Sequence, residues 1–171
     1  PARPGEVADP AGLARADREL VQDTFRVLAI GFSYMDGQAT LDGVVARRGE
    51  VPYTHMLYSE LGDLYVGKQR YTDAADTYRA FVHRDPDHER APLLQMQAIE
   101  AYRKGGFAQL VLDGKKEFVE RYRLGSSFWA NRTPAEFPLV AKELKTSLTD
   151  LAQYYHAAAQ RSRSKPDYQE A

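Results

Sequence analysis

The sequence predicts an all-α protein built of stacked antiparallel helix pairs, and two observations support this prediction. First, a unit of 34 residues that starts at His55 has packing residues at the spacing of a repeated helical hairpin: Tyr58, Leu61, Gly62, Tyr65, Ala74, Tyr78, Phe81 and Pro86. Second, parts of this unit return 37 residues later, with Ala98, Ile99 and Tyr102 in the places of Leu61, Gly62 and Tyr65, and FVER at 118–121 in the place of FVHR at 81–84. A recurring unit of this length is typical of helical repeats.

The first hairpin is expected over about residues 16–49. Residues 1–15 are rich in Pro, Gly and Ala without periodicity, so we expect an extended or disordered lead-in. A helix follows, with Asp17 as its expected cap and an end near Gly37. Its apolar residues recur at helical spacing: Leu20, Val21, Phe25, Leu28 and Phe32. A second helix is expected over 39–48.

The clear repeat occupies 55–88. Its first helix begins just after Pro52, which cannot sit inside a helix, and runs to about residue 67. Its second helix is expected over 71–84, with a continuous apolar stripe. Because glycine has no side chain, Gly62 lets the second helix approach the first closely.

A further repeat is expected over about 91–123, with the turn between its helices at 105–107. The packing face of its second helix is expected to consist of Phe107, Leu110, Val111 and Phe118. The correspondence with the preceding unit is imperfect, because Phe107 lies 36 residues after Tyr71 and Gly114 stands where a large aromatic is expected, so one turn must differ.

The segment at about 123–138 breaks the pattern and is expected to be an insertion, with Trp129 buried against the stack. A partial repeat follows over about 139–171, with a helix over 139–162. One face of that helix carries Leu144, Leu148, Leu151, Ala152 and Tyr155. Residues 167–171 are similar to the start of another second helix, so we expect the chain to be a piece of a longer array.

Composition narrows the possible functions. A net charge of -1 gives no basic field to attract nucleic acid or anionic lipid. Mean hydropathy is -0.55, and no apolar run is long enough to span a bilayer. The absence of cysteine excludes thiol catalysis, thiolate metal sites and disulfides.

The motifs resemble those of a known repeat family. They are LGDLY at 61–65, YTDAADTYRAFV at 71–82, YRKGGF at 102–107, KEFVERY at 116–122 and DLAQYYH at 150–156. Together they resemble tetratricopeptide repeat (TPR) proteins, in particular long TPR proteins of the Gram-negative bacterial envelope. These are often lipoproteins, similar in style to the TPR components of outer-membrane protein assembly. The likeness runs from about Gly31 to the end of the chain.

The resemblance implies a TPR-like right-handed α-solenoid that acts as a non-enzymatic scaffold or adaptor. Its expected location is the bacterial periplasm or outer membrane, with anchoring through a lipidated cysteine upstream of this sequence; otherwise it is cytoplasmic. No cofactor or metal is expected, and the expected partner is a protein or peptide.

In TPR arrays the first helix of each repeat lines a concave groove. The matching positions here are Met56, Ser59, Asp63, Val66, Leu93, Met96, Glu100 and Arg103. Two methionines and a leucine suit an adaptable apolar peptide groove, because the thioether chain repacks easily. The alternative is that Met96 or Leu93 fills the core between repeats. Ser59 and Asp63 stand where TPR clamps for an acidic C-terminus need Lys, Arg or Asn, so such a clamp is not expected.

Other polar clusters are interpreted as structural. The segment HRDPDHE at 83–89 contains two histidines and three acids, but a proline turn separates the histidines, which favours a solvated turn over a metal site. Gly105-Gly106 lacks the Gly-Lys-Ser/Thr of a phosphate loop. The cations around Lys115 and Arg121 alternate with acids at helical spacing, which indicates a salt-bridged surface. Arg161, Arg163 and Lys165 indicate an exposed helix end.

Two other functions stay open. The chain is alternatively a repeat segment of a larger envelope enzyme that acts on the cell wall, with the active site elsewhere. It is also compatible with a self-assembling structural protein whose end at Ala171 docks on a neighbouring copy.

Overall fold

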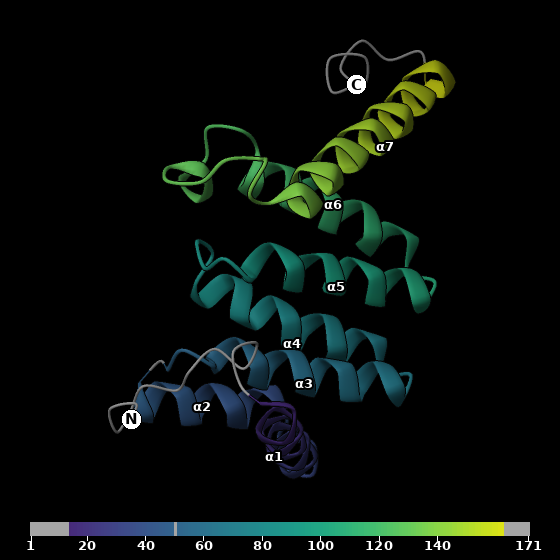
Figure 1. Cartoon of the computed structure of the whole chain (residues 1–171). Coiled ribbons are helices and arrows are strands. Elements are labelled where there is room, and N and C mark those ends of the chain that lie inside the picture. The colour runs from purple at the N-terminus through teal and green to yellow at the C-terminus, as the bar shows by residue number, and fades with distance from the viewer. Residues whose placement is uncertain (1–13, 50, 163–171) are drawn as a thin grey trace.

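The computed structural model describes residues 14–49 and 51–162 (Figure 1). These residues form seven α-helices that pack in sequential, antiparallel order, which confirms the predicted all-α class. The helices are α1 (Arg15–Ser33), α2 (Gln38–Arg48), α3 (Thr54–Gly67), α4 (Tyr71–Arg84), α5 (Ala91–Lys104), α6 (Ala108–Tyr122) and α7 (Pro138–Ser162), with a short 3-10 helix, η2 (Ser127–Trp129), between α6 and α7.

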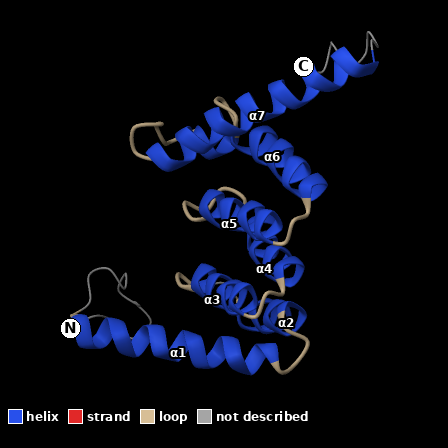
Figure 2. Cartoon of the chain, turned by 90° about the vertical axis from the view of Figure 1, so that its right-hand side faces the viewer, coloured by secondary structure: helices blue, strands red, loops and turns tan. Residues whose placement is uncertain are grey.

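The helices are stacked so that alternate helices share a side. Figure 2 shows α3 and α5 on one side of the stack and α2 and α4 on the other, with α1 and α7 at its two ends. α3 and α5 begin 37 residues apart and end 37 residues apart, and α4 and α6 also begin 37 residues apart. The spacing found in the sequence is therefore the spacing of the helix pairs.

Most helices begin and end near the residues predicted from the sequence. The N-cap of α1 differs from the prediction. The first helical residue is Arg15, and the N-cap residue is Ala14, whose side chain makes no capping hydrogen bond. Asp17 instead lies inside the first turn, where its negative charge interacts favourably with the positive end of the helix dipole. The predicted helix start at 167–171 lies outside the described residues.

The larger core extends from α1 through α5. It depends on a close contact between α3 and α4. A methyl group at Gly62 would lie 2.6 Å from Cζ and 2.7 Å from Cδ1 of Tyr78. The Tyr78 ring is buried, and its hydroxyl donates a hydrogen bond of 2.6 Å to Asp63 Oδ1. The expected role of Gly62 in close helix approach is confirmed.

The helices α5 and α6 also approach each other closely, but the glycine and the large residue have changed places between the first and second helix. Ile99 occupies the place of Gly62, and a methyl at Gly114 would lie 2.9 Å from Ile99 Cγ1. The large residue is therefore on the first helix and the glycine on the second, the reverse of Gly62 and Tyr78. This exchange explains why the two units align imperfectly at Gly114.

A second core forms where the chain between α6 and α7 folds back. It comprises Ile99, Phe118, Tyr122, Phe128, Trp129, Val140 and Leu144. As predicted, Trp129 is buried, and its indole Nε1 donates a hydrogen bond of 2.7 Å to the carbonyl of Tyr122. Arg132 stacks on the Phe128 ring, with 4.6 Å from Cζ to the ring centroid. The segment between α6 and α7 thus fastens α7 to the stack.

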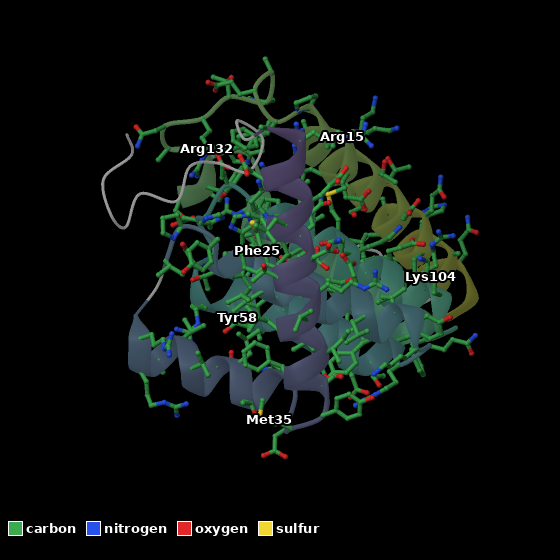
Figure 3. The ribbon with its side chains drawn as sticks, turned by 60° about the horizontal axis from the view of Figure 1, so that its bottom comes forward. Arg15, Phe25, Met35, Tyr58, Lys104 and Arg132 are labelled. Carbon is green, nitrogen blue, oxygen red and sulfur yellow. The ribbon has the colours of Figure 1, made fainter. Side chains whose placement is uncertain are left out.

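Several residues of the predicted packing faces are exposed. Phe107 and Leu110 are 38% and 37% exposed, because α6 turns its covered side, with Phe118, towards α5 and α7. Leu148 and Ala152 of α7 are also exposed. On α1, Leu20 is 67% and Leu28 43% exposed, since among the described residues only α2 and α3 pack on this helix. Figure 3 looks onto the uncovered side of α1, from Arg15 at its start to Met35 in the turn that follows it.

Candidate functional site

A groove of about 700 Å³ opens along the side of the stack formed by α3 and α5. The N-terminal half of α3 and nearly the whole of α5 line it, and α6 and α7 close one end. Its apolar lining consists of Met56, Leu93, Leu94, Met96, Ile99 and Val111. The remaining lining is polar or charged and comprises His55, Ser59, Glu60, Arg90, Gln97, Glu100, Arg103, Lys115, Glu143 and Thr146.

Six of the eight residues predicted to line a groove lie together in this one: Met56, Ser59, Leu93, Met96, Glu100 and Arg103. Asp63 and Val66 do not line it. Asp63 accepts the hydrogen bond from the Tyr78 hydroxyl, and Val66 packs against the larger core. Both residues lie towards the C-terminal end of α3, beyond the hollow part of the surface.

The two interpretations of Met96 are both realised in the structure. Its side chain is half-buried and packs against the second core, and it also lines the groove. Met56 likewise packs against the larger core and lines the groove. The floor of the groove is therefore the outer surface of the two cores.

The last two helices contribute to the groove, although none of their residues was predicted to line it. Val111 and Lys115 of α6, and Glu143 and Thr146 of α7, also line the groove. The aromatic packing at 128–137 determines where α7 lies, and no local spacing in the sequence reports it. Glu60 was missed although it directly follows the predicted Ser59.

The cations of the groove have acidic partners. Arg103 binds Glu100 through two hydrogen bonds of 2.7 Å, which with the charge of Arg103 outweigh burial and lower the pKa of Glu100. Lys115 pairs with Asp150 of α7, and Arg90 lies 3.4 Å from Glu89. These pairs leave little uncompensated positive charge along the groove.

His55, at one end of the groove, is held in an aromatic setting. Its ring centroid lies 5.2 Å from that of His88, whose ring in turn meets Phe81 edge-on at 5.1 Å. Burial, followed by the charges of His88 and Arg90, lowers the pKa of His55. Near neutral pH the neutral imidazole therefore adds an apolar surface with a polar edge to the groove.

The two histidines of the segment at 83–89 make separate structural contacts. His83 Nε2 lies 3.1 Å from Glu117 Oε1, while His88 packs on Phe81 and His55. Glu117 also forms salt bridges of 3.1 Å with Arg79 and 2.9 Å with Arg121, so this cluster connects α4 with α6. Within 14–49 and 51–162, no group of three or more His, Asp or Glu side chains is placed to hold a metal ion.

A smaller hollow of about 370 Å³ lies at the α1–α2 turn, next to α4. Its lining is mainly polar and includes Asp36, Tyr65, Arg70, Asp73 and Asp76. Arg70 is paired with Asp73 at 2.6 Å. Compared with the groove on α3 and α5, this hollow offers little apolar surface to a ligand.

Comparisons of the chain with protein-family models, with curated proteins and with solved structures found no match. None of the helices in the described part of the chain is both long and apolar enough to cross a membrane. The groove offers an apolar floor with flexible thioether side chains and a rim of charged side chains, an arrangement suited to holding a ligand by contact.

Proposed function

We propose that this chain is a non-enzymatic interaction scaffold that binds a partner peptide or helix in the groove on α3 and α5. The observation that carries the proposal is the convergence of six groove residues from two helices that are 37 residues apart in sequence. Because the helix pairs recur at this spacing, equivalent faces of α3 and α5 lie side by side. A rigid groove of this kind binds a peptide with little ordering cost on the protein side.

The architecture we propose is a TPR-like right-handed α-solenoid. It is supported by the resemblance of the motifs, by the repeated spacing of the helix pairs, and by the close contact at Gly62. The bacterial envelope remains the location expected from that resemblance.

The proposal is tested with peptides selected by this chain from a displayed library of random 16-residue sequences. The binding variant carries Met96→Arg and Glu100→Lys, which place bulk and positive charge in the groove. The control variant carries Thr72→Arg and Glu120→Lys, the same charge changes at exposed positions of α4 and α6 outside the groove.

Selected peptides are expected to lose at least tenfold in affinity for the groove variant, measured by fluorescence anisotropy, and to bind the control variant like the parent chain. Far-UV circular dichroism checks that both variants keep their helices. Equal affinity for the parent chain and a folded groove variant would place the binding site elsewhere.

A further inference from the structure

The groove has an asymmetric charge that points to the kind of peptide it holds. Its cations Arg90, Arg103 and Lys115 are paired with acids, whereas Glu60 and Glu143 form no ion pair with any other described residue. Glu60 belongs to α3 and Glu143 to α7, and Figure 2 shows α5 between these two helices. Two carboxylates without an ion-pair partner among the described residues therefore line the groove from the helices on either side of α5.

Glu60 lies where its negative charge is poorly compensated. Its side chain is half-buried, and burial together with the charge of Asp63 raises its pKa against the opposing effect of Arg26. A cation supplied by a ligand at this position would therefore be attracted more strongly than at an exposed surface carboxylate.

Glu143 is held in place for such a contact. The hydroxyl of Ser147, which is fully buried, donates a hydrogen bond of 3.0 Å to Glu143 Oε1. A carboxylate fixed by a buried neighbour loses less side-chain entropy when it meets a cation than a freely rotating one.

The distance across the groove limits the spacing of the ligand's charges. Packed helices lie about 8–10 Å apart, so two helices on either side of a third are separated by roughly 16–20 Å. An extended peptide covers this distance in about 5–6 residues, and a helix parallel to it in about 11–13. Met56, Leu93 and Met96 line the same groove as the two acids.

We propose that the groove selects basic amphipathic peptides, with apolar side chains on the methionine-lined floor and Lys or Arg side chains that reach Glu60 and Glu143. This inference rests on the proposed function and adds the chemistry of the partner. The attraction acts through partly exposed carboxylates, so it weakens as salt concentration rises.

The test compares the sequences that the same random library yields on two variants. The reversal variant carries Glu60→Lys and Glu143→Lys. The matched control carries Asp113→Lys and Glu120→Lys, the same charge change at exposed positions of α6 outside the groove.

Peptides selected on the parent chain are expected to be enriched in Lys and Arg on both sides of an apolar core. Their affinity should fall at least tenfold on the reversal variant, fall several-fold between 50 and 300 mM salt, and change little on the control. Selection on the reversal variant should favour Asp and Glu instead.

Two failures are distinguishable. If the selected peptides show no basic enrichment but still lose binding to the Met96→Arg, Glu100→Lys variant, the groove binds peptides and the inference about charge is overturned. If they bind that groove variant undiminished, the proposed function fails, and this inference fails with it.

Discussion

Replacing Gly62 with alanine should destabilise the protein, although alanine is the better helix former. The added methyl would lie 2.6 Å and 2.7 Å from two ring carbons of Tyr78, whereas carbon atoms in contact prefer about 3.5–4.0 Å. The ring would have to recede by about 1 Å, yet it is buried and its hydroxyl is hydrogen-bonded to Asp63.

The expected loss follows from two opposing contributions. Forced overpacking of a core costs about 1–3 kcal/mol, and disturbing the bond to Asp63 adds about 1 kcal/mol. Higher helix propensity returns about 1 kcal/mol. The net change in the free energy of unfolding is therefore a loss of about 1–3 kcal/mol, to be measured by urea denaturation followed by far-UV circular dichroism.

Gly31 provides the matched control, because a methyl there would have no neighbour within 4 Å. Gly31→Ala should raise stability by about 0.5–1 kcal/mol through helix propensity and unfolded-state entropy. In a chain that carries Tyr78→Leu, which replaces the facing ring with a smaller side chain, Gly62→Ala should cost less free energy of unfolding than in the parent chain. A double-mutant cycle measures this coupling between the two residues. If Gly62→Ala stabilised the protein as much as Gly31→Ala, the close contact between α3 and α4 would be refuted.

Two further predictions concern polar groups that are buried or half-buried. Tyr78→Phe should cost about 1–2 kcal/mol because it removes the donor to Asp63. Tyr122→Phe should be neutral or stabilising, since the buried Tyr122 hydroxyl has no hydrogen-bond partner among the described residues. Equal losses in urea denaturation would contradict this contrast. Glu117→Gln should cost about 1–3 kcal/mol at pH 7, because it leaves Arg79 and Arg121 without their anion. Burial raises the pKa of Glu117, but its bonds to His83, Arg79 and Arg121 outweigh burial and hold the pKa below 4.5. The contribution of ionised Glu117 to the free energy of unfolding is therefore present above that pH and is lost as the pH falls through the lower folded-state pKa. The difference between parent and variant should therefore shrink on acidification, and a constant difference from pH 7 to pH 3 would exclude the ion cluster as its cause.

The helix limits and the close approach at Gly62 could be predicted because each depends on residues near in sequence. Proline and glycine mark the ends of the helices, and apolar periodicity marks their faces. Gly114 was recognised as a mismatch, but its explanation requires Ile99, which faces it from another helix. Pairs of this kind become visible only when both helices are in place.

The groove could be predicted in part for the same reason. Equivalent positions on α3 and α5 gave six of its residues, since both helices follow the same repeat. Asp63 was also predicted, but it is not among the residues that line this groove, and its carboxylate accepts a hydrogen bond from the Tyr78 hydroxyl. Glu143 was missed because aromatic packing at Phe128 and Trp129 directs α7, and this packing has no counterpart in the preceding repeat.

The most direct test of peptide binding uses the three methionines of the chain. Met56 and Met96 line the groove, while Met35 is exposed at the turn after α1 and outside it. With methyl-labelled methionine, the NMR spectrum contains one signal for each, assigned by single Met→Leu variants. Titration with a library-selected peptide should shift the Met56 and Met96 signals together and leave Met35 unchanged. Saturable binding that leaves the signals of Met56 and Met96 in place would contradict the groove as the binding site.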